Sequence, residues 1–403
     1  MTGTIGVGVI GTGIMGAAHA MAFLSAPTIF ETALGARLEV IGDVNLPAAR
    51  KAQARFGFQR AVGSWQEVIA DPAVDLVSIT TPNALHRDIA LAALKAGKHV
   101  YCEKPLAADL QGAKDMAAAA KNAAGKTLVG YNYLKSPAVE FARRLIAEGA
   151  IGKVSYFRGV YDEDYMADEM TPYSWRCRQD MAGLGALGDL CSHLVSVAQV
   201  LMAPIARLVA DTPPFIEKRP VPAAGDGTER RDVAVALSGE WRAVENEDTA
   251  QALVQFANGN MGSLVTSRAH WGRKSHLAFE VFGSEGSILF DHERMNELQV
   301  YTKGAADAPT NGHRLIPMGP EHPYYGRFTP AKGHGIGFND LKIIEVAHLL
   351  NGIAGQETLY PTIRDALATE RVLHAIIASA RAGRNSACRA QSRQGPQLRR
   401  QRA

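Results

Sequence analysis

Short apolar runs alternate with amphipathic stretches along the first 130 residues of the chain. The runs are rich in β-branched residues, which is typical of strands buried on both faces, and Gly or Pro residues separate them from the helical stretches. Strands are predicted at residues 5–10, 36–43, 74–82, 98–103 and 126–132, with helical stretches between them. This alternation predicts an α/β domain with a doubly wound parallel sheet of the Rossmann type.

The apolar pattern changes to a period of two in the second half of the chain. Segments between residues 248 and 302 alternate apolar and polar positions, and Gly or Asn turns separate them. This pattern predicts a C-terminal α+β domain with a large, mostly antiparallel open sheet. The predicted domains are 1–131 and 132–384, followed by a disordered basic tail at 385–403. Residues 212–232, rich in Pro, Gly and charge, are expected to form an exposed excursion.

Composition excludes several classes of protein. The 403 residues are 47% hydrophobic and 21% charged with a net charge of +3, which is too small to indicate nucleic-acid or membrane partners. No apolar run is expected to reach the ~18 residues that span a bilayer. The four cysteines form no CxxC pair, so no metal site or disulfide framework is expected and a reducing, cytoplasmic compartment is the default.

The turn after the first strand, "GTGIMG", indicates a dinucleotide ligand. Gly11 permits the tight turn, Gly13 lets the backbone approach a pyrophosphate, and Gly16 allows close packing of helix and strand. The helix N-terminus then faces the phosphates. A lone GxGxxG pattern is weak, but this one follows a predicted strand and opens a helix. The alternative is a glycine turn without a ligand.

Asp43 ends the next predicted strand, 27 residues after Gly16 and somewhat beyond the usual offset of about 20. A longer helix or loop at residues 25–36 would account for the excess. A carboxylate there binds the ribose hydroxyls and repels a 2′-phosphate, so NAD is favoured over NADP. Arg50 and Lys51 keep NADP open, and a turn-forming Asp is the structural alternative.

Glu103, Lys104 and Pro105 stand at the tip of a buried strand, where ligands of open α/β sheets bind. Lys104 can therefore bond a substrate hydroxyl near the nicotinamide, although a surface ion pair would explain the two charges equally well in isolation. Further along, Asp189 and His193 are spaced i, i+4 at the start of a helix and share a face. The carboxylate could orient the imidazole, which could take a proton from a secondary alcohol. A satisfied helix pair is the alternative.

Taken together, these motifs resemble the glucose–fructose oxidoreductase / inositol dehydrogenase / rhizopine-catabolism (Gfo/Idh/MocA) family. The matching segments, over about residues 4–383, are the 11–16 turn, "TTPNALH" at 80–86, "CEKPLA" at 102–107, "GYNY" at 130–133, "GALGDLCSH" at 185–193 and residues 360–380. Cys191 departs from the family, which usually has Gly there. The resemblance implies that Lys104, Asp189 and His193 form the catalytic set.

The resemblance and the loop composition give the remaining site residues. Polar and aromatic residues are dense at 161–178 and 322–340, which suits a polyhydroxylated ligand. The predicted cofactor contacts are Gly11, Thr12, Gly13, Ile14, Met15, Gly16, Asp43, Thr81, Asn83, His86, Glu103, Lys104, Trp175 and Arg176. The predicted substrate contacts are Lys104, Tyr133, Tyr161, Arg176, Asp189, His193 and His334.

Two function classes follow. The first is an oxidoreductase that moves hydride between NAD and a secondary ring hydroxyl of a sugar, cyclitol or glycoside; for a glycoside, the resemblance points to the 3-hydroxyl. The second is a noncatalytic dinucleotide- or sugar-sensing regulator on the same fold, which would not need Lys104, Asp189 and His193 together. The resemblance also implies a homo-oligomer, a dimer or tetramer, that forms through the C-terminal sheet.

Overall fold

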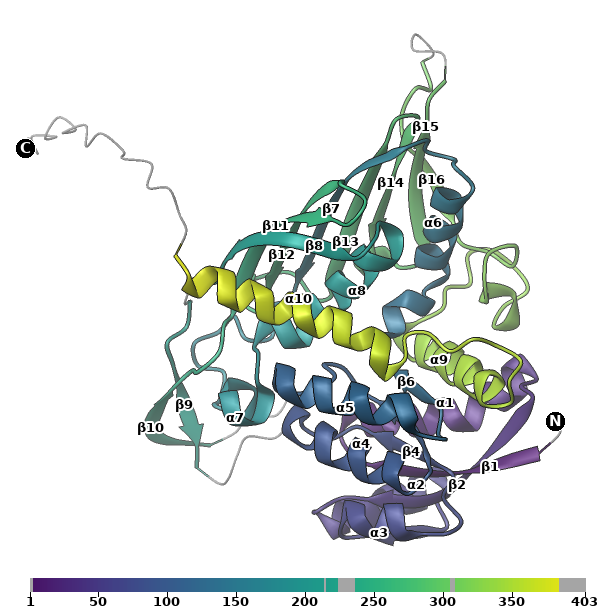
Figure 1. Cartoon of the computed structure of the whole chain (residues 1–403), viewed down its shortest axis with the longest axis vertical. Helices are drawn as coiled ribbons and strands as arrows, with labels where there is room; N and C mark the ends of the chain where they lie inside the picture. The colour runs from purple at the N-terminus through teal and green to yellow at the C-terminus, as the bar shows by residue number, and fades with distance from the viewer. Residues whose placement is uncertain (1–2, 214, 224–235, 305–308, 384–403) are drawn as a thin grey trace, which may run out of the picture.

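The apolar runs near the N-terminus form a six-stranded parallel sheet, as predicted (Figure 1). The structure, a computed structural model, describes residues 3–213, 215–223, 236–304 and 309–383. The sheet order is β3-β2-β1-β4-β5-β6. These strands are β1 (Gly3–Ile10), β2 (Leu34–Gly42), β3 (Arg60–Val62), β4 (Leu76–Ile79), β5 (His99–Cys102) and β6 (Thr127–Val129).

Helices cover both faces of this sheet. One face packs against α1, the helix that follows the glycine turn, and against α9 from the far end of the chain. The other packs against α3, α4 and α5. The bounds are α1 (Ile14–Phe30), α2 (Leu46–Phe56), α3 (Trp65–Ala70), α4 (His86–Lys95), α5 (Leu110–Asn122) and α9 (Phe338–Ile353). Because α1 runs to Phe30, helix length accounts for the long spacing between the glycine turn and Asp43.

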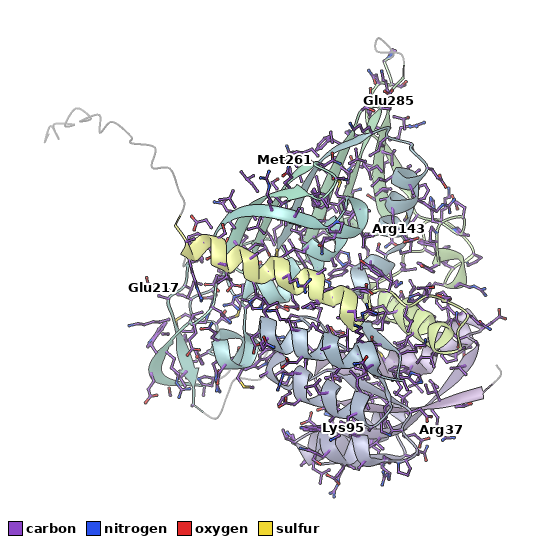
Figure 2. All side chains as sticks on the ribbon, viewed as in Figure 1. Arg37, Lys95, Arg143, Glu217, Met261 and Glu285 are labelled. Carbon is purple, nitrogen blue, oxygen red and sulfur yellow. The ribbon has the colours of Figure 1, made fainter. Side chains whose placement is uncertain are left out.

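The second sheet has eight strands in the order β16-β15-β14-β13-β7-β12-β11-β8. Its pairs are antiparallel except for β7 with β12, so the predicted mostly antiparallel sheet is confirmed. Its strands are β7 (Val154–Asp162), β8 (Ile205–Asp211), β11 (Thr249–Phe256), β12 (Met261–Ser267), β13 (His276–Gly283), β14 (Gly286–Asp291), β15 (Glu297–Thr302) and β16 (Arg314–Pro317). Figure 2 shows Met261 on this sheet and Glu285 in the turn between β13 and β14, at the opposite end of the molecule from Arg37 and Lys95.

Helices of the second half lie between the two sheets and beside them. They are α6 (Pro137–Ala147), α7 (Gln179–Ala182), α8 (Ser192–Leu201) and α10 (Ile363–Arg381). In Figure 1, α10 crosses the molecule between α5 and the large sheet, and it contacts α5, α8 and β8. The C-terminal segment therefore contacts both halves of the molecule.

The expected excursion at 212–232 is partly wrong. Within its described residues, β9 (Lys218–Pro222) pairs with β10 (Leu237–Ala243) in a hairpin, and the Arg219 side chain is fully buried. The buried guanidinium donates to the carbonyls of Met166 and Asp168, so it ties the hairpin to the loop at 166–168, although polarity alone suggested that the segment carrying Arg219 was exposed. Residues 214 and 224–232 of this excursion and the predicted tail at 385–403 lie outside the described residues.

One apolar helical run is longer than the sequence pattern suggested. Among the described residues, Gln179–Leu201 has the length and composition to cross a membrane, but 78% of its most apolar window is buried inside the protein. Such burial is typical of the core helix of a globular domain.

Candidate active site

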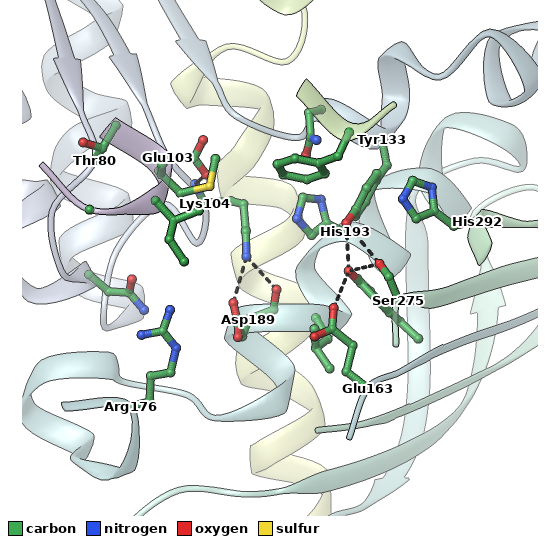
Figure 3. Close-up of a pocket in the computed structure, with 18 of the residues that line it drawn as sticks. Thr80, Glu103, Lys104, Tyr133, Glu163, Arg176, Asp189, His193, Ser275 and His292 are labelled. Atoms are coloured by element: carbon green, nitrogen blue, oxygen red, sulfur yellow. Dashed lines mark hydrogen bonds and ion pairs between the residues drawn. The ribbon is translucent and has the colours of Figure 1, made fainter. Parts of the chain in front are cut away.

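A cavity of about 480 Å³ lies where the carboxyl ends of the parallel strands face the large sheet (Figure 3). Its size is in the range of small-molecule sites. It is lined by Gly13, Ile14, Met15, Thr80, Thr81, Asn83, Glu103, Lys104, Asn132, Tyr133, Tyr161, Glu163, Trp175, Arg176, Asp189, Leu190, His193, Lys274, Ser275, His292 and Phe338. Most of the predicted site residues are in this set.

The glycine turn forms the cofactor end. Gly11 has φ +105°, and a Cβ there would lie 2.6 Å from the carbonyl oxygen of Thr80. A Cβ on Gly16 would lie 2.0 Å from the carbonyl oxygen of Gly11. Gly13 and the exposed Ile14 line the cavity at the start of α1. The two glycines outside the lining thus shape the turn, and the N-terminal amides of α1 remain available for an anion.

Asp43 directly follows β2 and is bonded to this turn. Its Oδ2 accepts from the backbone N and the hydroxyl of Thr12, at 2.9 and 2.6 Å, and its Oδ1 accepts from the backbone N of Asn45 at 2.8 Å. Thr12 therefore serves the turn through Asp43 rather than through the cavity wall.

Two polar atoms at this end have no protein partner among the described residues. The Thr81 hydroxyl and the Trp175 indole Nε1 are buried without a hydrogen bond. Buried polar groups normally have a partner, so both atoms fit a bound polar ligand such as the ribose or amide of a dinucleotide. Arg176 stacks its guanidinium 4.5 Å from the Trp175 ring and points toward the cavity in Figure 3.

Asn83 and His86 differ in their placement. Asn83 lines the cavity and donates to the carbonyl of Ala182 at 2.9 Å. His86 is fully buried outside the cavity lining, with its ring nitrogens 2.9 Å from the carbonyl oxygen of Pro105 and 3.0 Å from that of Thr81. The prediction that His86 contacts the cofactor is therefore corrected, since its side chain instead ties the cofactor loop to the Glu103–Pro105 segment.

Lys104 forms the centre of the site. Its Nζ donates to Asp189 Oδ1 at 2.9 Å and to the Asp189 carbonyl at 2.7 Å, as Figure 3 shows. The other carboxylate oxygen, Oδ2, accepts from the Tyr165 hydroxyl. Although burial alone would raise it, Lys104, Arg176 and Tyr165 hold the pKa of Asp189 well below its usual range. Asp189 is therefore ionised and balances the Lys104 charge.

His193 lies at the start of α8, just after a π-helical turn at Leu187–Cys191, a feature often found at functional sites. Its ring lies 4.5 Å from that of Tyr133, and its Nδ1 is buried with no hydrogen-bond partner in the described part of the chain. Burial, with the nearby Lys104 charge, lowers the pKa of His193 well below its ordinary value. The imidazole is therefore neutral and can accept a proton.

The expected hydrogen bond from Asp189 to His193 is not found among the described residues. The Asp189 carboxylate instead accepts from the Lys104 ammonium and the Tyr165 hydroxyl. Helical spacing correctly indicated a common cavity, but it could not show that two donors from elsewhere in the chain take the carboxylate.

The far end of the cavity is a cluster of hydroxyl groups beside a carboxylate. The Tyr161 hydroxyl lies 2.9 Å from that of Tyr133, 3.3 Å from Ser275 Oγ and 3.2 Å from Glu163 Oε1. The His292 ring, which lies 4.4 Å from that of Tyr133, completes this wall. The sequence predicts Tyr133 and Tyr161 at this wall. It does not predict Glu163, Ser275 or His292. Of these, Glu163 could have been found from the sequence, because it lies in the polar stretch at 161–178.

His334 is not part of the site. It is exposed in the loop before α9 and outside the cavity lining, while its backbone carbonyl accepts from the Tyr325 hydroxyl at 2.6 Å. The predicted loop reaches the cavity four residues later, through Phe338, because α9 begins there.

Comparison with known proteins places this geometry in a family. Residues 5–131 match the oxidoreductase family with an NAD-binding Rossmann fold, and residues 139–289 match the GFO/IDH/MocA C-terminal domain. The chain belongs to the Gfo/Idh/MocA family of oxidoreductases. It is thus an NAD-dependent oxidoreductase, and the expected fold, enzyme class and cofactor are confirmed.

Members of this family with known names are similar over most of the chain. Levoglucosan dehydrogenase of Pseudarthrobacter phenanthrenivorans is 38% identical over 93% of this chain and 96% of its own length. The 1,5-anhydro-D-fructose reductase of Ensifer adhaerens is 32% identical over 71% of this chain and 77% of its own. A solved levoglucosan dehydrogenase complex with NADH and levoglucosan aligns with TM-score 0.86 and 36% identity, over 94% of this chain and 98% of that one.

Proposed function

We propose that this enzyme oxidises a secondary ring hydroxyl of a cyclic sugar, cyclitol or glycoside with NAD. The observation that carries the proposal is a neutral, buried His193 and a Lys104–Asp189 ion pair in the same cavity as the glycine turn. A noncatalytic sensing role would not require these three side chains to meet in one cavity.

The residues of the cavity have separate roles in this oxidation. NAD, when bound, accepts the hydride from the carbon that carries the hydroxyl. Lys104 donates a hydrogen bond to the substrate oxygen, and His193 accepts the proton that this oxygen loses as the carbonyl forms. Asp189 and Tyr165 hold the Lys104 ammonium in place. The Lys104 charge acts on His193 directly, since it contributes to the lowered pKa of the imidazole.

The substrate class rests on the far end of the cavity. Tyr133, Tyr161, Ser275 and Glu163 offer donors and acceptors at hydrogen-bonding distances from one another, which suits several adjacent hydroxyls on one ring. Relatives named for levoglucosan and 1,5-anhydro-D-fructose support a ring of this size. For a glycoside we place the oxidation at the 3-hydroxyl, on family resemblance.

We expect His193→Ala and Lys104→Ala each to lower kcat by at least about 100-fold, the low end for a positioned acid–base group. NAD affinity should change little because neither side chain forms the glycine turn. Steady-state kinetics and NAD titration test this, with His313→Ala, an exposed histidine outside the cavity, as the control. A His193→Ala enzyme with parental turnover would contradict the assignment.

A substrate panel tests the class. NADH absorbance should rise with levoglucosan, myo-inositol, glucose or an aryl glycoside, whereas lactate should react poorly because it leaves buried polar groups of the site unpaired. Lactate as the best substrate would refute the proposal.

We also propose a homo-oligomer that forms through the outer face of the large sheet. Val209, Leu253 and Met261 lie on one face of three adjacent strands and are 46%, 56% and 47% exposed. Burial of this apolar face would remove it from water. Light scattering should give a mass that is a multiple of the chain mass, and Leu253→Lys should reduce this measured mass.

A cytoplasmic location is part of the same proposal, supported by three free, buried cysteines at 102, 177 and 191.

A further inference from the structure

A buried ionic cluster lies directly behind the cofactor end of the cavity. We call His19, Tyr101, Glu103, Lys342 and Glu345 the Glu103 cluster. Lys342 Nζ lies 2.5 Å from Glu103 Oε1, 2.9 Å from Glu345 Oε2 and 3.4 Å from the Tyr101 hydroxyl. His19 Nε2 lies 2.8 Å from Glu103 Oε1. Glu103 alone of the five lines the cavity.

The cluster unites elements that are distant in the chain. Its members come from the cofactor helix α1, from strand β5 and the residue that follows it, and from α9. All five side chains are buried, and Lys342 is 0% exposed. A lysine with no access to water needs compensating charge, and here the compensation is the same carboxylate that faces the cavity.

The charges in the cluster are unequal in number. One ammonium faces two carboxyl groups, and Glu345 Oε1 is buried with no hydrogen-bond partner from the described residues. Burial raises the pKa of Glu345, although Lys342 opposes the shift. Burial would also raise the pKa of Glu103, but Lys342 and His19 overcome it and hold that pKa well below its usual range. The Lys342 ammonium, the one positive charge in the cluster, thus keeps Glu103 ionised.

We propose that Lys342 is a positioning residue that keeps a negative charge on Glu103 beside the nicotinamide and thereby favours the binding of NAD⁺ over NADH. The inference rests on the proposed function, because hydride transfer to NAD requires the nicotinamide beside the substrate that Lys104 and His193 bind. The oxidised ring carries a positive charge that reduction removes, so an ionised carboxylate at the cavity wall stabilises the oxidised form selectively. Lys342, behind the carboxylate, sets its protonation without facing the ligand.

Other titratable groups near Glu103 do not replace Lys342. Lys104 is already paired with Asp189. Burial lowers the pKa values of His86 and His193, from α4 and α8, so both are neutral. Tyr101 and Cys102, on β5, have pKa values raised by burial and are neutral as well. His19 also has its pKa lowered by burial.

The test compares cofactor affinities rather than turnover. Dissociation constants for NAD⁺ and NADH are measured by calorimetry between about pH 6 and pH 9 for the parent and Lys342→Met. The parent ratio should be flat with pH. In the variant Glu103 loses its cation and takes up a proton as pH falls, so NAD⁺ affinity should drop about tenfold or more toward pH 6 while NADH affinity changes less than about twofold. Lys135→Met, which removes another buried lysine outside the cluster, should keep the flat ratio.

A flat, parental ratio in Lys342→Met would overturn the inference and leave the proposed function intact. A parent protein that binds neither cofactor would instead contradict the proposed function. Should Lys342→Met not fold, Glu103→Gln gives the same decision: loss of about tenfold in NAD⁺ affinity with NADH unchanged supports the inference, and equal loss for both cofactors refutes it.

Discussion

At the scale of single residues, Asp43 combines two roles that a substitution can separate. Its carboxylate accepts from the Thr12 backbone and hydroxyl, so truncation would loosen the glycine turn as well as remove the charge. Asp43→Asn keeps an oxygen acceptor and removes the charge. We expect it to weaken NAD binding modestly and to raise kcat/KM with NADP by about tenfold, because the 2′-phosphate no longer meets a carboxylate.

The control for Asp43→Asn is Asp75→Asn. Asp75 accepts from the backbone of Gly6 on β1 and directly precedes β4, at the amino end of that strand, whereas Asp43 follows the carboxyl end of β2. Asp75→Asn should leave the NAD/NADP ratio unchanged. An Asp43→Asn enzyme with the parental ratio would show that the selectivity lies elsewhere.

Tyr165 carries a role that the sequence motifs do not reveal. Its hydroxyl donates to the Asp189 oxygen that Lys104 leaves open, and this bond helps to keep the pKa of Asp189 low. In Tyr165→Phe that pKa should rise, so the Lys104–Asp189 pair persists only at higher pH. We expect kcat to fall about tenfold, with its acidic limb shifted to higher pH and KM almost unchanged.

A pH profile of kcat checks this, with Tyr173→Phe as the control because Tyr173 is buried in the same segment but packs against Arg242 instead of bonding Asp189. An unshifted acidic limb in Tyr165→Phe would show that the hydroxyl only fills space.

The half of the site that the sequence predicts is the half that sits at strand ends. Lys104 follows β5 and Asp43 follows β2, and the geometry of a parallel sheet brings such ends together. Ser275 and His292 flank β13 and β14 of the other sheet, so only the meeting of two sheets puts them in the cavity. The prediction that His334 contacts the substrate is wrong for the converse reason, because the composition of a loop does not show where the loop points.

At the scale of elements, the period-two and β/α patterns predict both sheets. They do not predict the parallel pairing of β7 with β12 or the hairpin of β9 with β10. Both depend on contacts between distant segments. The hairpin also explains how the loop that carries Tyr165 is held, since Arg219 donates to the carbonyls of Met166 and Asp168 at 2.5 and 2.8 Å.

We therefore expect Arg219→Met to keep the apolar packing but to leave the two carbonyl groups without this hydrogen-bond donor. The free energy of unfolding should fall by about 1–3 kcal/mol. Hydrogen exchange at residues 165–170 should quicken and kcat should fall with it. Arg242→Met is the matched control, because Arg242 pairs with Arg219 across the hairpin but is exposed. Equal exchange in the two variants would exclude this anchoring role.

At the scale of the whole molecule, a buried carboxyl joins α10 to the segment that follows Lys104. Glu370 on α10 accepts from the Leu106 backbone at 2.7 Å, and its other oxygen is buried with no partner among the residues that the structure describes. Burial raises the pKa of Glu370 to about 8. The folded protein thus holds a proton that the unfolded chain releases near pH 4.5, so the stabilisation is complete at low pH and is lost as pH rises toward 8.

Glu370→Gln keeps the acceptor and removes the titration. Urea unfolding at pH 5 and pH 9 should show a parental loss on the order of 3 kcal/mol that the variant lacks. Glu240→Gln, an exposed carboxyl on β10, should retain the parental loss. The same pH dependence in parent and Glu370→Gln would contradict the raised pKa.

The return of α9 and α10 to the first sheet limits how this enzyme can be recombined. A chimaera that took residues 1–131 as a portable cofactor module would leave Glu103 without Lys342, the Leu106 amide without Glu370, and the α1 face of the sheet without its α9 cover. A graft that carries both closing helices with the N-terminal segment preserves these contacts. The segments that support cofactor binding in this chain are therefore not contiguous in sequence. An exchange of cofactor specificity should transfer residues 1–131 together with α9 and α10.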